Sequence, residues 1–187
     1  AWERAVSVFR CDYSFVAQVR GWLPDPIGAV LWFGPDAPHS TAYVPFYCNH
    51  IDLPEAYDSG SHAKFDPNNA FWVHSFAANW ADLKFSYIIK DIQAMQNKVE
   101  GRQFAQQPAI ENAALQLYKV DPQLAIEFLT EYSNNNANRV VREWWEFGQT
   151  LITRYNDGYV DGNSVGYPDW WLKEVGYESG PLKHGLK

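Results

Sequence analysis

The sequence comprises 187 residues, of which 47% are hydrophobic and 20% are charged, and its formal net charge is −7 at pH 7. This length and hydrophobic content suit one globular domain with a substantial core and argue against intrinsic disorder. The acidic balance gives no support to nucleic-acid binding, which usually needs a basic face, and no apolar run approaches the roughly 20 residues that span a bilayer.

Three short apolar segments near the N-terminus predict strands at 4–20, 28–34 and 40–47. β-branched and aromatic residues dominate these segments, as a pleated surface covered on both faces requires. The connections between them are rich in Pro, Gly and Asp, which end strands and form turns. Closely spaced strands with short connections favour an antiparallel meander over about 4–47.

The sequence from about residue 68 to about residue 175 predicts a helical part. Asp66 and Pro67 offer a helix start, because Asp caps well and Pro fits the first helical position. Apolar residues at helical spacing then predict a long helix that ends before Gly101. The expected helices are 68–100, 109–119, one from Pro122 to near the run 134–136, 138–154, and 168–174. The predicted fold class is therefore α+β, with antiparallel N-terminal strands covered by C-terminal helices in one unit over 1–187.

Short segments along most of the chain occur in an order that is specific as a set, although each is weak alone. They are 7–20, 30–39, 44–47, 79–81, 144–148, 155–159 and 166–172. This set resembles the C-terminal part of the dipeptidases of peptidase family C69, which are related to secernins and belong to the N-terminal-nucleophile hydrolases. The resemblance implies the C-terminal portion of an αββα hydrolase fold. It also implies an enzyme that cleaves short peptides or related amides through an N-terminal cysteine.

An N-terminal nucleophile needs a side chain that attacks the substrate and a free α-amine, whose pKa of about 8 lets it take the proton. Cys11 and Cys48 are internal, and Ala1 has an amine but no nucleophilic side chain. The sequence alone therefore lacks the group that the resemblance requires. The expected partner is an N-terminal segment of the same precursor that bears the nucleophilic cysteine, with a small peptide as substrate. Assembly into a homo-oligomer stays open.

Arg10 lies in an apolar run, so it is the arginine that is least easily explained as a solvated surface charge. A tetrahedral intermediate needs donors aimed at its developing negative charge, and a substrate carboxylate needs a cation. We therefore predict that Arg10 supports catalysis and that Asp12 and Ser14 contribute to substrate binding. The alternative is an ion pair of Arg10 with Asp12, or with an acidic residue elsewhere, that serves packing alone.

Cys11 and Cys48 are the only two cysteines, and both fall on or beside the predicted sheet. They predict a disulfide if the strands bring their Cα atoms within about 7 Å, which would indicate an oxidising compartment such as a secreted or lysosome-like one. Two separate small apolar residues are the alternative. A catalytic pair of Cys48 and His50 is disfavoured, because such partners normally come from distant segments. No metal-ligand spacing of histidines is present, and no cofactor is predicted.

Aromatic residues make up 17% of the chain, which raises a rival hypothesis from another class of protein. Exposed tryptophans could stack on sugars, as in a carbohydrate-binding or other non-catalytic aromatic-rich module. Aromatic residues at helical spacing more often form a core. The exposure of the tryptophans discriminates the two hypotheses, since a sugar site needs coplanar rings on the surface and a hydrolase buries most of them.

Overall fold

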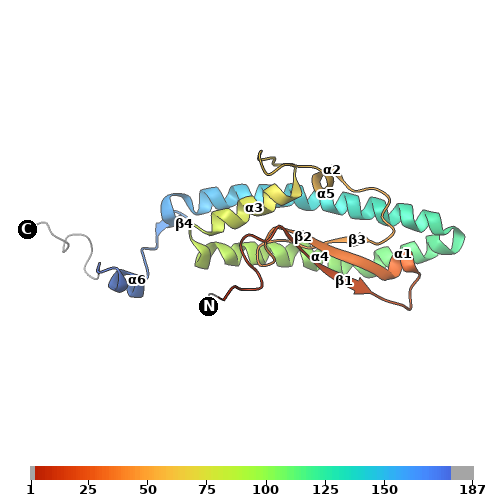
Figure 1. Ribbon diagram of the computed structural model, residues 1–187, viewed down its shortest axis with the longest axis horizontal. Coiled ribbons are helices and arrows are strands. Elements are labelled where there is room, and N and C mark those ends of the chain that lie inside the picture. The colour runs from red at the N-terminus through yellow and green to blue at the C-terminus, as the bar shows by residue number, and fades with distance from the viewer. Residues whose placement is uncertain (1–2, 178–187) are drawn as a thin grey trace, which may run out of the picture.

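A computed structural model describes residues 3–177 of the chain, and its shape is elongated (Figure 1). Two long helices, α4 (Phe85–Val120) and α5 (Pro122–Arg154), form a hairpin that runs along the molecule. Helix α3 (Ala70–Ala81) and a three-stranded sheet pack beside this hairpin. This combination of a small antiparallel sheet with predominant helices confirms the α+β fold class.

The sheet is an antiparallel meander of β1 (Tyr13–Val19), β2 (Ala29–Pro35) and β3 (Val44–Tyr47), in that spatial order. Tyr13 lies opposite Pro35, and Val30 lies opposite Tyr47. The predicted meander is therefore confirmed. Strand β1 begins later than expected, because residues 6–10 form bends and a turn closed by the Cys11 N–H donating to the Val8 carbonyl at 3.1 Å. A short helix, α1 (Asp25–Gly28), joins β1 to β2.

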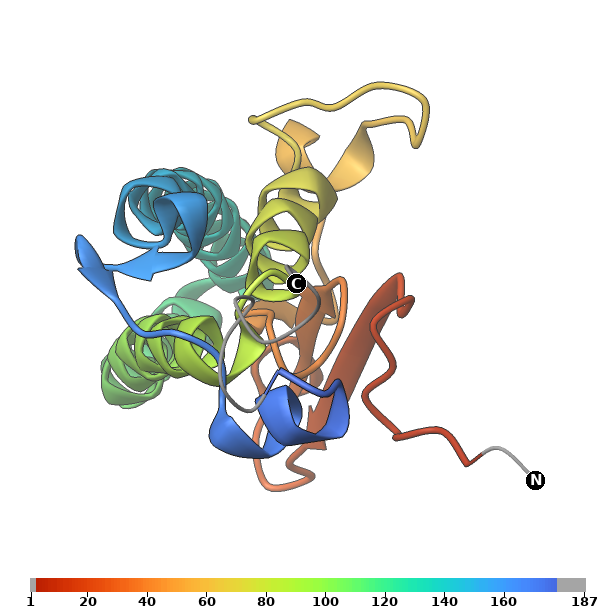
Figure 2. The ribbon, with the colours of Figure 1, turned by 90° about the vertical axis from the view of Figure 1, so that its left-hand side faces the viewer.

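The helices cover the sheet from one edge. Every residue of β3 is buried, whereas most residues of β1 are exposed. Figure 2, which looks along the long helices, shows β1 as the strand farthest from them. The expectation that the strands are covered on both faces is therefore right for β3 and wrong for β1.

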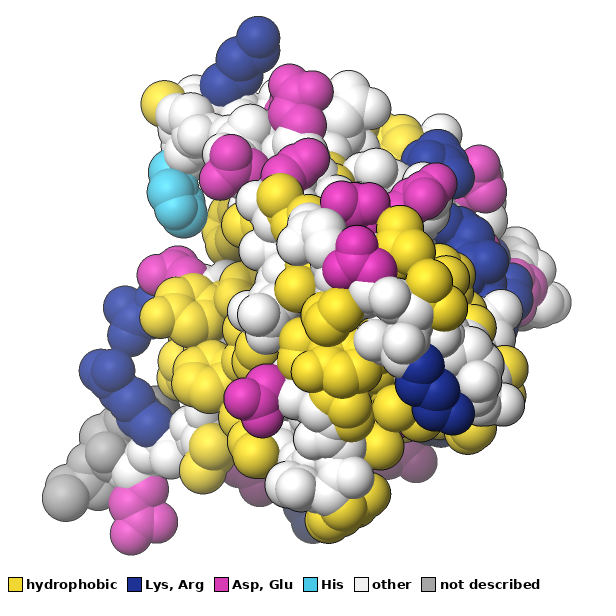
Figure 3. Space-filling model, turned by 90° about the vertical axis from the view of Figure 1, so that its right-hand side faces the viewer, with side chains coloured by type: hydrophobic (Ala, Val, Ile, Leu, Met, Phe, Trp, Pro, Cys, Tyr) yellow, Lys and Arg dark blue, Asp and Glu magenta, His cyan; other side chains and the backbone are white. Residues whose placement is uncertain are grey.

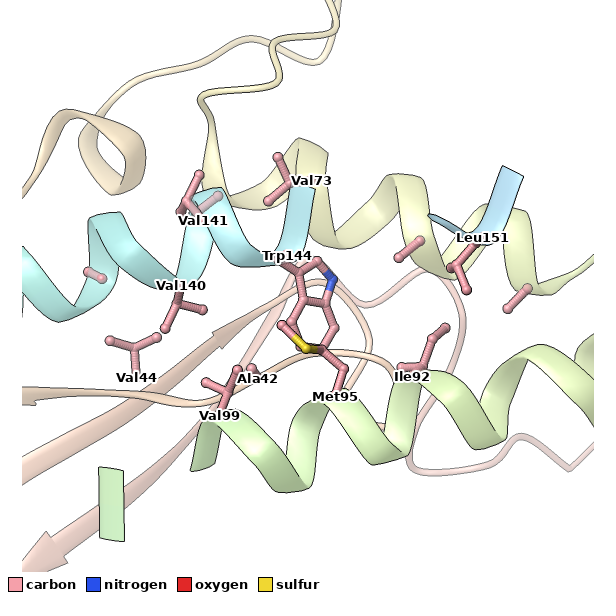
Figure 4. Close-up of a cluster of buried hydrophobic side chains, with 14 of the residues drawn as sticks. Ala42, Val44, Val73, Ile92, Met95, Val99, Val140, Val141, Trp144 and Leu151 are labelled. Carbon is pink, nitrogen blue, oxygen red and sulfur yellow. The ribbon is translucent and has the colours of Figure 1, made fainter. Parts of the chain in front are cut away.

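The main hydrophobic core lies among α3, α4, α5 and β3, with Trp144 of α5 at its centre (Figure 4). The Trp144 side chain is fully buried and points toward Met95 of α4. His74 of α3 stacks on the indole, with ring centroids 4.5 Å apart. The buried neighbours labelled in Figure 4 are Ala42, Val44, Val73, Ile92, Val99, Val140, Val141 and Leu151.

A second core cluster, near the turn of the α4–α5 hairpin, joins α1, β2 and β3 to both long helices, and it contains Ile27, Val30, Trp32, Tyr47, Ala114 and Leu129. Beside it, the Glu111 carboxylate of α4 accepts a hydrogen bond from each terminal guanidinium nitrogen of Arg20, both at 2.6 Å. The Tyr47 hydroxyl and the Gln107 amide also donate to Glu111, at 3.1 and 2.8 Å. One carboxylate therefore ties the end of β1 and the end of β3 to α4.

The helix predicted over 68–100 is two helices, because the chain turns between Ala81 and Phe85. The N–H groups of Leu83 and Lys84 donate to the carbonyls of Trp80 and Ala81, and Lys84 has non-helical angles of φ −154° and ψ 58°. Helix α3 starts where Asn69 accepts a hydrogen bond from the Trp72 N–H at 3.2 Å. Asn69, rather than Asp66, is therefore its cap.

Neither Gly101 nor the run 134–136 ends a helix. Gly101 is exposed and a Cβ there would meet nothing within 4 Å, so α4 continues through it at a local cost of about 1 kcal/mol relative to Ala. Asn134 and Asn136 stay helical because their side chains bond to other segments: Asn134 donates to the Asp52 carbonyl at 3.0 Å, and Asn136 donates to Gln103 at 2.5 Å. Tertiary contacts therefore override both local stop signals.

Short elements complete the chain: α2 (Glu55–Asp58), η1 (Asn156–Gly158), the β4 (Tyr159–Val160) and β5 (Asn163–Ser164) hairpin, and α6 (Asp169–Glu174). The predicted last helix is confirmed as α6, which projects away from the body in Figure 1. Among the described residues, no helix has the length and apolar character needed to cross a bilayer.

The role of Glu111 in holding the sheet against α4 can be tested with the substitution Glu111→Gln, which keeps the size of the side chain and removes its charge. Because Arg20 would then lack its carboxylate in a nearly buried site, we expect a loss of about 3 kcal/mol in the free energy of unfolding, measured by urea denaturation. The matched control is Glu143→Gln, which breaks the more exposed pair with Arg102 and should have a smaller effect. Equal losses in the two variants would contradict the anchoring role of Glu111.

Candidate functional site

The predicted site residues lie close together in sequence, but the structure does not join them into one cluster. Arg10 is exposed in the turn before β1, with its guanidinium 5.4 Å from the centroid of the Phe9 ring. The Ser14 hydroxyl bonds to the Tyr43 hydroxyl at 2.7 Å. Asp12 is exposed, and no ion pair joins it to Arg10 in the described part of the chain. The expectation that Arg10 is buried within a strand is therefore wrong.

The two cysteines are both free thiols. Cys11 lies near the end of β2 at Pro35, whereas the Cys48 N–H donates to Ala29 at the start of β2. Seven residues of strand separate these ends, or about 20 Å at about 3.3 Å per residue. A disulfide needs Cα atoms within about 7 Å, so this geometry contradicts the predicted bridge.

A hollow of about 230 Å³ opens at the start of β1. Its walls come from the beginning of β1, the end of β2, the segment 56–62 and the beginning of α3. The side chains that line it include Asp12, Tyr13, Phe33, Tyr57, His62 and Trp72. We refer to it as the β1-start pocket.

Asn69 fixes the geometry of one wall of the β1-start pocket. Its side-chain amide donates to the Ser59 carbonyl at 2.5 Å, while its carbonyl oxygen caps α3 through the Trp72 N–H. Gly60 has φ +125°, and a Cβ there would lie 2.5 Å from the Asn69 amide nitrogen. Only glycine suits that backbone position. The loop is therefore held against α3 by Asn69 and by a glycine that lets the two approach.

Aromatic rings form much of the lining. Tyr13 stacks on Phe33 with ring centroids 5.6 Å apart, and Phe33 meets the edge of Tyr57 at 6.2 Å. The Tyr57 hydroxyl is buried and has no hydrogen-bond partner among the described residues. Burial strongly raises the pKa of Tyr57, so this hydroxyl stays neutral. An unsatisfied buried hydroxyl is costly, so Tyr57 makes an unfavourable contribution to stability at this wall of the pocket.

Acidic groups lie beside these rings. The Asp36 backbone N–H donates to the Asp12 carbonyl at 2.8 Å, which holds the two residues together. Asp36 is buried, adopts φ +65°, and has a carboxylate oxygen without a partner among the described residues. Its burial raises the pKa of the Asp36 carboxyl to about 6, against a lowering by the Ala37 N–H. A pocket with aromatic walls and a carboxylate at its rim suits a cationic ligand such as an ammonium group.

The relation to known proteins is shown by a model of peptidase family C69, which matches residues 1–98 of the chain. This chain belongs to peptidase family C69. Two curated proteins are also similar to it. One is a probable dipeptidase of Latilactobacillus sakei, 35% identical over 75 residues. The other is Dipeptidase A of Lactobacillus helveticus, 31% identical over 84 residues. These stretches cover 40% and 44% of this chain, and only 16% and 17% of the two relatives.

The β1-start pocket lies wholly within the residues that the C69 model matches. These residues also carry two histidines with side-chain partners. His39 bonds to the Ser7 hydroxyl at 2.6 Å, and His50 bonds to Asn134 at 2.8 Å. No hydrogen bond joins Cys48 to His50 in the described part, so this C69 chain shows no such catalytic pair there. No group of three His, Cys, Asp or Glu residues that could hold a metal occurs among its described residues.

Sequence reasoning missed the arginine that this C69 chain buries. Arg20, not Arg10, makes the nearly buried ion pair, because its partner Glu111 is brought to it by α4 from 91 residues away. Tyr57 and Asp36 were missed as well. The run from Gly34 to Pro38 signals a turn, in which an Asp with positive φ is acceptable, but it does not reveal that the carboxyl is buried.

Because the Asp36 carboxyl is buried, we predict that Asp36→Asn changes the stability of the fold by an amount that depends on pH. Asn, like Asp, tolerates the positive φ of this position. The folded-state pKa of Asp36 is raised to about 6, so the folded protein keeps a proton that the unfolded chain releases near pH 4. Its contribution to stability is therefore present below about pH 4 and is lost as the pH rises through about 6. At pH 7 we expect the variant to be more stable than the wild type by about 2–3 kcal/mol, with little difference at pH 4.

Urea unfolding of both proteins at several values between pH 4 and pH 7 measures this effect. His74 changes stability in the opposite sense, because burial lowers the pKa of its imidazole to about 4 and stability falls as the pH drops from about 6.5. That contribution is common to both proteins and cancels in their difference. A difference that stays constant over this range would exclude ionisation of buried Asp36 as its cause.

Proposed function

We propose that this chain is the C-terminal part of a cysteine-type dipeptidase whose nucleophile is the N-terminal cysteine of another segment of the same precursor. Membership of peptidase family C69 and the names of the two dipeptidase relatives support the activity. The proposed reaction is hydrolysis of a short peptide through an acyl-enzyme. The thiol sulfur attacks the peptide carbonyl carbon and passes its proton to the α-amine of the same residue, which gives that proton to the leaving amine as the C–N bond breaks. Water then attacks the thioester, which frees the carboxylic acid and restores the thiol.

The surroundings of the two internal cysteines support a nucleophile elsewhere. The Cys11 thiol donates to the Tyr13 carbonyl at 3.2 Å, so its hydrogen is engaged with a backbone acceptor and not with a side-chain base. Cys48 is exposed, and His50 beside it is engaged with Asn134. No hydrogen bond joins either thiol to a basic side chain in the described part of the chain, whereas an activated nucleophile normally has such a partner.

The proposal of a partner segment rests on one observation: β1 is an edge strand whose residues are mostly exposed. Among the strands that the structure describes, β1 pairs with β2 alone, so the backbone groups of its outer edge have no strand partner there. Phe15 and Val16, which point to opposite faces, are 58% and 57% exposed, and Val19 is 76% exposed. An apolar, uncovered edge strand favours association. We propose that the partner segment covers β1 with a mostly apolar contact of more than about 1,000 Å².

Further apolar surface continues beyond the end of β1. Trp22, in the turn after this strand, is 79% exposed. Figure 3, which faces the end of the molecule where the α4–α5 hairpin turns, shows a broad area of hydrophobic side chains between acidic and basic ones. A second copy of the chain could cover this surface instead of the partner segment, and an intact-mass measurement distinguishes the two.

The β1-start pocket gives the proposal a substrate-binding step. A dipeptide carries a free α-ammonium group, which suits the aromatic walls and the Asp12 carboxylate. Arg10 lies two residues away, exposed and without a carboxylate partner in the described part of the chain. It is proposed to support the negative charge of the substrate carboxylate or of the tetrahedral intermediate, and Ser14 stays a proposed contact on the other side of β1.

The tryptophans favour the hydrolase over the carbohydrate-binding alternative. Most of the described ones are buried or half-buried, and Trp144 and Trp32 lie in the two cores. The exposed tryptophans are Trp22, Trp170 and Trp171. Trp171 stacks on Tyr167, with ring centroids 4.8 Å apart, but no stacked pair of two tryptophans occurs among the described residues. Their distribution matches a core role rather than a sugar-stacking platform.

The proposed function can be tested on the native protein that contains this chain. Intact mass should reveal an accompanying segment, and the preparation should hydrolyse dipeptides. Iodoacetamide should abolish hydrolysis by alkylating an N-terminal cysteine outside this sequence, with Cys11→Ser and Cys48→Ser variants retaining activity. Loss of activity on alkylation of Cys11 or Cys48, or a lone 187-residue monomer without hydrolysis, would overturn the proposal.

Two substitutions test the proposed substrate contacts in the assembled enzyme. Asp12→Asn removes the carboxylate and should raise the KM for free dipeptides at least about tenfold, but not that for N-acetylated analogues, which lack the ammonium group. Arg10→Lys keeps the charge but loses the planar pair of donors, so it should lower kcat/KM at unchanged stability. Wild-type kinetics of both variants would remove these residues from the site.

A further inference from the structure

A hollow of about 660 Å³ lies between α4 and α5, outside the residues that the family model matches. Its volume is within the range of small-molecule sites, about 300–1,000 Å³. Ala109, Ile110 and Phe128 supply an apolar wall. The polar lining includes Gln106, Tyr132, Asn136, Arg139 and Arg142.

The two arginines give this hollow a positive charge in a chain whose formal net charge is −7. Arg139 and Arg142 form no ion pair in the described part of the chain. Glu143 nearby is already paired with Arg102, at 2.9 Å. Glu131 is the one acidic residue of the lining, and it lies two helical turns from Arg139. The local charge is therefore available for an anion.

Arg139 is held in place by buried polar groups rather than left to move in solvent. Its guanidinium donates to the Asn136 side chain at 2.9 Å, and Asn136 donates to Gln103 at 2.5 Å. Gln103 in turn donates to the Tyr43 carbonyl at 2.7 Å. Asn136 is 3% exposed and Gln103 is fully buried. This chain of bonds from the β3 side fixes the guanidinium, and such preorganisation lowers the entropy lost on binding a ligand.

Three residues of the lining carry polar atoms that have neither solvent nor a partner among the described residues: Arg139 Nε, the Tyr132 hydroxyl and Gln106 Oε1. An unsatisfied buried polar group costs about 1–3 kcal/mol, so three in one place are unusual. Burial raises the pKa of Tyr132, against a lowering by the neighbouring Arg139 and Arg102. Tyr132 therefore stays a neutral donor beside two cations.

We propose that this hollow binds a small organic carboxylate that has an apolar body. The guanidinium groups of Arg139 and Arg142 bind the carboxylate, and the Tyr132 hydroxyl is a further hydrogen-bond donor. The apolar body lies against Ile110 and Phe128. An arginine fork matches the planar geometry of a carboxylate. Inorganic phosphate offers the same charge to the arginines but nothing to the apolar wall, so the carboxylate is the better match.

Isothermal titration of the purified protein that carries this chain tests the proposal with N-acetyl-L-phenylalanine as the probe. We expect N-acetyl-L-phenylalaninamide, which lacks the charge, and inorganic phosphate to bind at least about tenfold more weakly. Arg139→Gln and Arg142→Gln should each weaken binding of the carboxylate about tenfold or more. Because Arg142 is exposed, its substitution does not depend on the buried bonds that hold Arg139.

Two controls separate this site from the rest of the protein. Lys98→Gln removes an exposed positive charge of α4 outside the hollow and should leave binding unchanged. Asp12→Asn alters the β1-start pocket and should also leave it unchanged, so failure of the proposed dipeptidase function would not affect the result. Equal affinity for the acid and its amide, wild-type affinity in Arg142→Gln, or no binding of the acid at millimolar concentration would overturn the proposal.

Discussion

Strand β3 is buried on both faces, and the way in which the helices enclose it determines how the rest of the sheet is covered. Val44 and Phe46 face the core that contains Trp144, while Tyr47 faces the second cluster at the hairpin end. Because the helices enclose the sheet from this edge, each strand farther from it is less covered. Strand β1 is left with apolar side chains exposed on both faces, and a pocket opens at its start.

Buried polar residues fix the relative positions of sheet and helices where apolar packing alone would allow sliding. Glu111 joins Arg20 and Tyr47, while Gln103 and Glu100 bond to the backbone of Tyr43. Such bonds are directional, so they specify one register of α4 along β3. Helix α4 continues through Gly101 and Pro108 because these contacts, together with the two cores, outweigh the low helix propensity of glycine and proline.

The sequence was sufficient for features that depend on local patterns and not for those that depend on distant partners. Runs rich in β-branched and aromatic residues, joined by short connections, identified the antiparallel meander, and Pro122 identified the start of α5. The stop signals at Gly101 and 134–136 failed because their local preference is weaker than the packing around them. The inference that Arg10 is the arginine shielded from solvent was wrong for a related reason: the arginine that is shielded, Arg20, depends on a carboxylate 91 residues away.

The two hollows differ in the charge of their lining, which is acidic in one and basic in the other, and they lie in different parts of the chain. The β1-start pocket combines aromatic rings with Asp12 and lies inside the matched residues, beside the strand that remains uncovered. The hollow of Arg139 and Arg142 is built only from α4 and α5 and is connected to the sheet through Gln103 and Tyr43. The Tyr43 hydroxyl bonds to Ser14 of β1 at 2.7 Å, and Gln107 of α4 donates to Gln18 of β1 at 3.1 Å. The strand at whose start one pocket opens is therefore joined by hydrogen bonds both to Tyr43 and to the helix that lines the other hollow.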